Sequence, residues 1–199
     1  SMITLSIADT IVVGLNSVPG QIRIGEFDRV LIRPMSSWLQ AVVSEVSLRH
    51  LGQFFQGSIV LAYAVSNLSI DWSPAKLGAI AMMVITGFAL FSALFTVEAI
   101  LSFWTVNGVE AVNAFTYGGS TLARFPLHVL ERWMRFLFLW MVPVGFVSYY
   151  PSMFVLGKED PLGNPAWFML LGPVFVVAFC LLIAWGWGQA IRRYRSTGS

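Results

Sequence analysis

An uninterrupted apolar run is the feature that most constrains how this chain can fold. Residues 77–97 contain no charged side chain over 21 positions, and a helix of that length matches the roughly 30 Å hydrocarbon core of a bilayer. Of the 199 residues, 57% are hydrophobic and only 11% are charged, whereas soluble domains carry about 25% charged residues. The sequence therefore predicts an all-α fold, namely a polytopic membrane helix bundle that forms a single transmembrane domain over residues 1–199.

Several segments are apolar enough to enter a membrane, and four of them are long enough to be complete spans. The predicted complete spans are residues 51–70, 77–98, 133–150 and 167–189. Residues 1–18 form a partial span, and residues 151–166 form an outer re-entrant segment or loop.

Three local signals predict where these helices start, stop or bend. Pro19-Gly20 is expected to break the first helix. Ser73 is expected to cap the helix whose first position is Pro74. Pro143 is expected to kink the third complete span.

The charged side chains segregate between the two faces that this span count defines. All ten arginines fall on one face, whereas Lys76 and Lys158 fall on the other. Loops rich in arginine and lysine stay in the cytoplasm, so the arginine face is predicted to be cytoplasmic. We therefore expect a multi-pass protein of a bacterial inner or plasma membrane, with its C-terminus in the cytoplasm.

A charged segment, QIRIGEFDRVLIRP at residues 21–34, lies between two apolar runs on the predicted cytoplasmic face. Phe27, Val30 and Leu31 recur at helical spacing, and the acids precede the arginines, as the helix dipole favours. The pattern predicts a short amphipathic helix that lies along the membrane. Its role is either an interfacial anchor with snorkelling arginines or a docking element for a soluble partner.

Glu98 is an acid at the end of the second predicted complete span. An acid inside a span is costly and marks a functional site by default. The structural alternative is that Glu98 lies at the membrane boundary or pairs with an arginine of a neighbouring element. His50 and His128 have no second ligand at metal-binding spacing, so we interpret both as interfacial polar residues and expect no metal site.

The motifs of several common activities are absent from the sequence. It contains no GxxxxGK[ST] phosphate loop, no HExxH and no GxSxG, which argues against Walker-type ATP binding and against the matching hydrolases. Its basic residues are also too few for a nucleic-acid surface. We therefore expect no catalytic residue, no cofactor bound by this chain and no nucleic-acid partner.

Four motifs, in the order in which they stand, resemble a family of ABC transporter permeases. They are IRIGEFDRVLIRP, FWTVNGVEAVNAFTYGG, YYPSMFVLG and WGWGQAIRRYRSTG. The branch is usually called uncharacterised transport-system permeases, within the type 2 ABC exporter-like superfamily. The resemblance implies six spanning helices per permease, of which this chain would supply the end of the second and the third to sixth, so the first helix is expected to be missing. It also implies short re-entrant helices between helices five and six, which residues 149–156 would match.

The resemblance further implies that a cytoplasmic coupling helix, here within residues 20–34, docks into a groove of a separate ABC ATPase subunit. The positions that match this element are Ile24, Gly25, Glu26, Phe27, Asp28, Arg29, Leu31, Arg33 and Pro34. In such docking, Phe27 and Leu31 would fill a pocket of the ATPase while the charged residues pair with its polar rim. ATP and Mg²⁺ would bind to the ATPase, and the other partners would be membrane lipids and a second permease chain, identical or homologous.

The leading hypothesis is therefore a membrane-spanning permease subunit of an ABC transporter, an exporter that couples ATP hydrolysis by a separate subunit to substrate translocation. Two alternatives from other classes stay open. One is a non-transporting membrane scaffold that recruits a partner, and the other is an ion-coupled carrier that uses Glu98. The apolar and aromatic spans favour a lipid-like or amphipathic cargo.

Overall fold

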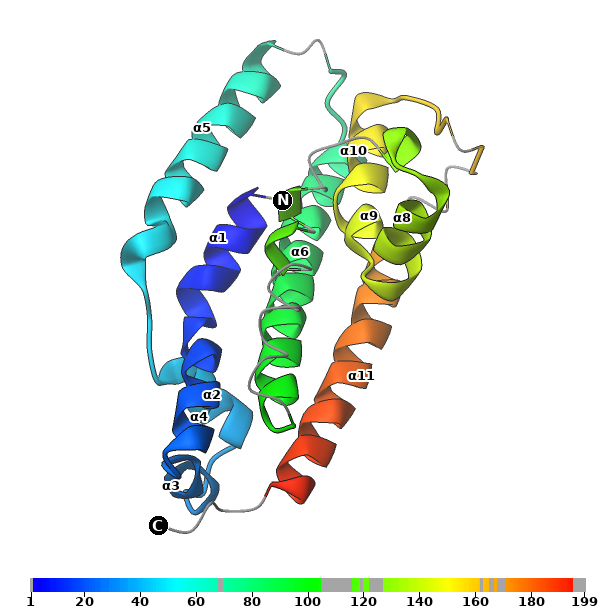
Figure 1. Cartoon of the computed structure of the whole chain (residues 1–199). Coiled ribbons are helices and arrows are strands. Elements are labelled where there is room, and N and C mark those ends of the chain that lie inside the picture. The colour runs from blue at the N-terminus through cyan, green and yellow to red at the C-terminus, as the bar shows by residue number, and fades with distance from the viewer. Residues whose placement is uncertain are drawn as a thin grey trace.

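The computed structural model describes residues 2–67, 70–104, 116–118, 120–121, 127–161, 163–164, 167 and 171–194. Within these ranges the chain is helical apart from turns and connecting segments, and it contains no strand (Figure 1). This confirms the predicted all-α class. The elements in chain order are α1 (Met2–Ile11), η1 (Val13–Ser17), α2 (Val18–Arg23), α3 (Phe27–Leu31), α4 (Ser37–Val43), η2 (Leu48–His50), α5 (Leu51–Asn67), α6 (Pro74–Ser102), η3 (Leu127–Val129), α8 (Arg132–Phe136), η4 (Leu137–Met141), α9 (Val144–Val147), α10 (Tyr149–Leu156) and α11 (Gly172–Arg193).

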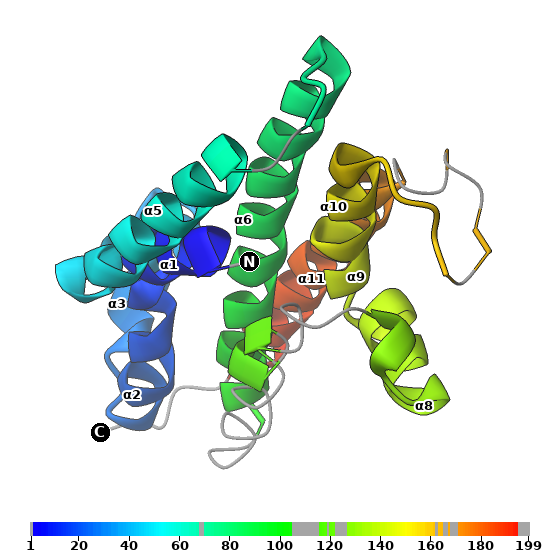
Figure 2. The ribbon, with the colours of Figure 1, turned by 90° about the horizontal axis from the view of Figure 1, so that it is seen from above.

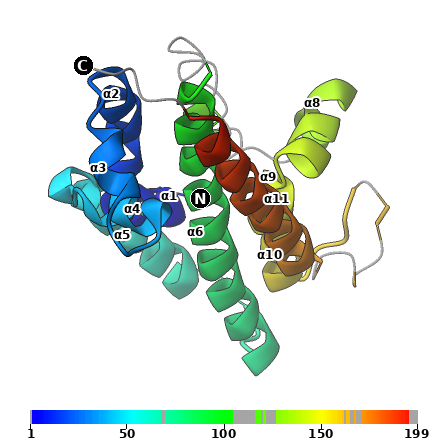
Figure 3. The same cartoon turned by 90° about the horizontal axis from the view of Figure 1, so that it is seen from below.

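Helix α6 is the central element of the bundle. It packs against α1 on one side and against α9, α10 and α11 on the other, and the views from above and below show α5 and α11 on opposite sides of it (Figures 2 and 3). The predicted helix start is confirmed, because the Ser73 side chain accepts a hydrogen bond from the Lys76 backbone N–H at 3.4 Å and Pro74 stands in the first turn. This cap fixes Pro74 as the first residue of α6.

Helices α6 and α11 are each long and apolar enough to cross a membrane. Helix α11 leaves large apolar side chains uncovered, and Val174, Leu181 and Trp185 are each about two-thirds exposed. Contiguous apolar exposure of this kind is rare in water-soluble monomers. The outer surface of α11 therefore suits a hydrocarbon solvent.

The first helical region bends, but not where the sequence predicted. The chain turns by 60° at Val12, between α1 and the η1–α2 pair. Pro19 instead stands in the first turn of α2, a position where the missing proline N–H costs no hydrogen bond. The expected break at Pro19-Gly20 is therefore wrong. The two pieces together are long and apolar enough for one bent span.

The region from α8 to α10 contains the predicted proline kink. The chain bends by 71° between Arg132–Met141 and Val144–Leu156. Val142, directly before Pro143, is extended, with φ −124° and ψ 97°, as the residue before a proline prefers. The two short pieces have the geometry of a broken span or of a re-entrant loop, so the membrane placement of residues 133–150 and 151–166 stays a prediction.

Helix α5 packs on α1 and η2 and exposes most of its side chains. Phe55, Ile59 and Tyr63 are each at least 60% exposed, so its outward surface is apolar like that of α11. The helix has 17 residues and ends at Asn67, and residues 68 and 69 lie outside the described part of the chain. The span predicted for residues 51–70 therefore stays a prediction.

Candidate functional site

The charged 21–34 segment, which falls within the predicted coupling element at residues 20–34, lies at the end of the bundle where α6 and α11 finish (Figure 1). It forms the end of α2 and the five-residue helix α3, which are joined by a turn at Gly25. Gly25 has φ +74°, a left-handed conformation that glycine adopts without steric cost. A helix as short as α3 is not stable by itself in water, so contacts with the bundle must hold it in place.

Phe27 supplies the main contact between α3 and the bundle. Its side chain is 0% exposed, and its ring makes edge contacts with Phe103 and Tyr194 at centroid distances of 5.2 and 5.3 Å. Phe103 follows α6 and also makes an edge contact with Trp187 of α11 at 5.9 Å. The structure thus corrects the expectation that Phe27 fills a pocket of the ATPase, because its ring fills a pocket of its own chain.

Helix α4, which follows the 21–34 segment, adds two hydrogen bonds to the same two long helices. The Trp38 Nε1–H donates to Thr96 Oγ1 of α6 at 3.0 Å. The Trp187 Nε1–H donates to Ser37 Oγ at 3.2 Å. Together these contacts form a unit that we call the joint, which ties residues 27–38 to α6 and α11. The joint consists of Phe27, Ser37, Trp38, Thr96, Phe103, Trp187 and Tyr194.

Tyr194, directly after α11, joins the aromatic contacts to an acid of the segment. Burial, followed by the nearby Asp28 carboxylate, raises the pKa of Tyr194 above its ordinary value of 10.0. The hydroxyl therefore stays protonated at neutral pH. Asp28 is only partly exposed, and its effect on Tyr194 places its carboxylate near the C-terminal end of α11.

Most of the other predicted contact residues face outward. Glu26, Arg29, Arg33 and Pro34 are exposed. The apolar members Ile24 and Leu31 are 65% and 39% exposed, and their neighbours Ile32 and Met35, which were not among the predicted residues, are 83% and 48% exposed. Gly25 is half-buried in the turn. An apolar surface with a charged border is thus available for contact.

The ion pair on this surface adds little rigidity. Arg29 Nη1 lies 4.0 Å from Glu26 Oε1, and the two side chains are 78% and 52% exposed. Exposed pairs of this kind contribute about 0–1 kcal/mol. The position of the segment therefore depends on the joint and not on its surface charges.

A second group of polar residues lies inside the bundle around Glu98. Glu98 is 4% exposed, and its Oε1 accepts a hydrogen bond from Thr116 Oγ1 at 2.8 Å. The Tyr117 hydroxyl donates to Asp9 Oδ1 at 3.1 Å, and His50 Nε2 lies 4.0 Å from Asp9 Oδ2. Glu98 is thus buried within α6, with a hydroxyl donor. Asp9 and His50 were missed as a pair, because no local spacing connects residues of α1 and η2.

The comparison with protein families decides what kind of protein carries these features. A family model described as ABC-2 family transporter protein matches residues 1–198. The chain belongs to the ABC-2 transporter family. No curated protein and no solved structure matched. The match confirms the resemblance to ABC transporter permeases, and with the apolar helices it makes the chain a multi-pass membrane protein and a transport subunit.

This ABC-2 family protein has a cavity of about 580 Å³ beside the joint. Trp38, Thr96 and Trp187 of the joint line it, together with Ser92 and Cys180. No charged side chain of the described residues lines the cavity. A movement of α4 relative to α6 or α11 would therefore change the shape of this cavity directly.

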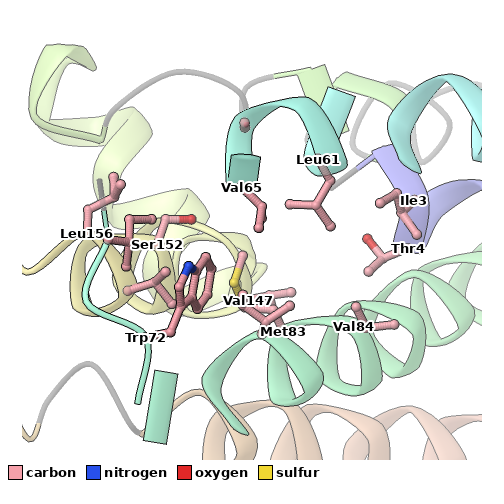
Figure 4. A pocket seen from close by; sticks show the side chains of 14 residues that line it. Ile3, Thr4, Leu61, Val65, Trp72, Met83, Val84, Val147, Ser152 and Leu156 are labelled. Carbon is pink, nitrogen blue, oxygen red and sulfur yellow. The ribbon is translucent and has the colours of Figure 1, made fainter. Parts of the chain in front are cut away.

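A second cavity, of about 240 Å³, lies towards the other end of α6, among α1, α5, α6 and α10 (Figure 4). Leu61, Trp72, Met83, Val147 and Leu156 contribute apolar surface. The polar groups that line it are uncharged side chains. Its lining suits an apolar group better than an ionised one.

Proposed function

We propose that this ABC-2 family protein is the membrane-spanning permease subunit of an ABC exporter, driven by ATP hydrolysis on a separate ATPase subunit. The observation that carries this proposal is the position of the 21–34 segment. Phe27 anchors the segment to the ends of both α6 and α11, while Ile24 and Ile32 leave apolar surface open for contact. A short element with one buried anchor and one free surface suits the transfer of motion between subunits.

The mechanism follows from how a packed contact transmits displacement. The ATPase binds ATP and Mg²⁺, and the closure of two ATPase subunits displaces the docked segment. Close-packed interiors deform little, so the joint passes the displacement to α6 and α11 and changes the cavity beside it. A path then opens between this permease and a second permease chain, identical or homologous. In this arrangement the segment and the C-terminus are cytoplasmic.

A second candidate function, an ion-coupled carrier, is favoured by the buried acids. Asp9 and Glu98 are 1% and 4% exposed, and ionisable groups within the membrane often mark ion or proton pathways. Each acid also accepts a hydrogen bond from a hydroxyl group, an arrangement that stabilises the structure without any transported ion. We therefore place this candidate second.

Co-purification in detergent with candidate ABC ATPase subunits tests the proposal. The wild-type chain should retain an ATPase, and the variant Ile24→Asp/Ile32→Asp should lose it, because charges replace the exposed apolar contacts. Lys158→Glu, an exposed charge change outside the 21–34 segment, is the matched control and should retain the ATPase. A wild-type chain that purifies without any ATPase would contradict the proposed function.

A further inference from the structure

Beside the exposed surface of the 21–34 segment lies a groove of about 290 Å³. Gln21 of α2, Glu26, Arg29 and Arg33 line it, together with Gln40 of α4. None of these five residues belongs to the joint. Two of them, Gln21 and Gln40, carry side-chain oxygens that are shielded from solvent and have no hydrogen-bond partner in the described part of the chain.

The orientation of the Gln40 amide is fixed by its neighbours. The side chain is 5% exposed, and its Nε2 donates to the backbone oxygens of Val30 and Met35 at 2.9 and 2.8 Å. An amide oxygen in that place would face two acceptors, so the nitrogen must occupy it. Gln40 Oε1 is therefore an acceptor without a donor.

The same reasoning fixes the amide of Gln21. Its Nε2 donates to Ser17 Oγ at 2.9 Å, and Ser17 Oγ donates its own hydrogen to the Gly14 backbone oxygen at 2.7 Å. Since the serine hydrogen is already used, the hydroxyl oxygen can only accept from the amide. Gln21 Oε1 is therefore also an acceptor that lacks a donor.

We propose that this groove receives a lysine or arginine side chain of the ATPase subunit, an inference that rests on the proposed function. Buried polar groups in proteins nearly always have hydrogen-bond partners, so two unpaired acceptors beside a partner surface call for a donor. Ammonium and guanidinium groups carry several donors and no acceptor. The lining contains charges of both signs, Glu26 together with Arg29 and Arg33, so the preference for a cation rests on the two acceptors.

The arginines at the rim do not reverse this preference. Arg29 lies against Glu26 at 4.0 Å, and its side chain is 78% exposed, so its charge is solvated and partly balanced. Arg33 is also exposed. A phosphate or carboxylate in the groove would face two oxygens that can only accept, and both N–H groups of Gln40 already donate to backbone oxygens.

The test is a titration of the detergent-purified permease with the ATPase subunit that co-purifies with it. Gln21→Lys places a cation in the groove and should weaken binding by about tenfold or more, as expected when a hydrogen bond to a charged group is lost. Gln21→Met removes the acceptor with little change of shape and should weaken binding by a smaller factor. Gly52→Lys is the control, because Gly52 lies outside the docking element at residues 20–34, is exposed, and has no atom within 4 Å of an added Cβ. This variant should bind like the wild type.

A rescue experiment then identifies the partner residue. Single lysine and arginine residues on the docking face of the ATPase are changed to glutamate, and one of these changes should restore binding to the Gln21→Lys permease. A cooperative thermal unfolding transition shows that a variant is folded. If Gln21→Lys does not fold, the binding test uses Gln21→Met.

The outcomes separate this inference from the proposed function. If the wild type binds the ATPase and the Gln21→Lys and Gln21→Met variants bind it with the same affinity as the wild type, the inference is overturned and the proposed function stays intact. Unchanged ATPase affinity together with loss of bound phosphatidylethanolamine from Gln21→Lys would also overturn it, because the groove would then hold a lipid ammonium group. Absence of binding by the wild-type chain would contradict the proposed function itself.

Discussion

Replacement of Phe27 by alanine should release the 21–34 segment from α6 and α11 while the rest of the bundle stays folded. The Phe27 side chain is 0% exposed, and truncation of a buried phenylalanine costs about 3–5 kcal/mol. Part of this cost is the loss of the ring contacts with Phe103 and Tyr194 at 5.2 and 5.3 Å, each of which contributes about 0.5–1.5 kcal/mol. The loss falls on one five-residue helix, α3, which does not hold its conformation alone.

Hydrogen exchange of the purified protein in detergent measures this release. If the free energy of opening falls by about 3 kcal/mol, the backbone amides of residues 28–33 and 35 should exchange about 100-fold faster in Phe27→Ala than in the wild type. Amides in the middle of α6 should not change. Ile32→Ala is the control, because Ile32 is 83% exposed and surface changes stay within about 0.5 kcal/mol. Equal exchange in the two variants would refute the role of Phe27 as the anchor.

Three further predictions concern other parts of the chain. Gly87→Ala should lower the free energy of unfolding by about 1–3 kcal/mol, because an added Cβ would lie 2.6 Å from Thr4 Cγ2. Gly78→Ala should not lower it, because no atom lies within 4 Å of an added Cβ there. Thermal unfolding of the two variants measures the difference. Glu98→Gln should leave nucleotide-driven activity of the complex unchanged, because an amide oxygen still accepts the hydrogen bond, and a loss of activity would support the ion-coupled alternative. Because the pKa of Tyr194 is raised, its contribution to stability is complete below pH 10 and is lost as the pH rises through the folded-state pKa. Tyr194→Phe should therefore make the alkaline decline of the unfolding temperature smaller than in the wild type, as measured by unfolding temperature against pH.

Features set by one residue and its immediate neighbours could be predicted from the sequence. The cap at Ser73 and the bend at Pro143 are examples, because a hydroxyl before a helix and a proline inside one act locally. The long apolar runs likewise predicted helices where α6 and α11 lie. The break expected at Pro19 failed because a proline can begin a helix as readily as end one, and only the packing of the chain decides between the two.

The direction in which Phe27 points could not be predicted. An amphipathic helix must cover its apolar face, but its own bundle and a separate partner cover it equally well. The deciding neighbours, Phe103 and Tyr194, are far away in the sequence. The pairing of Asp9 with His50 was hidden for the same reason, since each looks like an isolated polar residue until α1 and η2 pack together.

The central claim, that the joint carries motion from the ATPase to α6 and α11, can be measured as a distance. Spin labels are attached at Leu77 and Val174, which lie near the ends of α6 and α11 far from the joint and are 58% and 64% exposed. Cys180, the single cysteine, is first replaced by alanine. In the complex with its ATPase, trapping with ADP and vanadate should shift the distance between the labels in the wild type and leave it unshifted in Phe27→Ala at equal ATPase content. The same shift in both complexes would show that the motion does not pass through the joint.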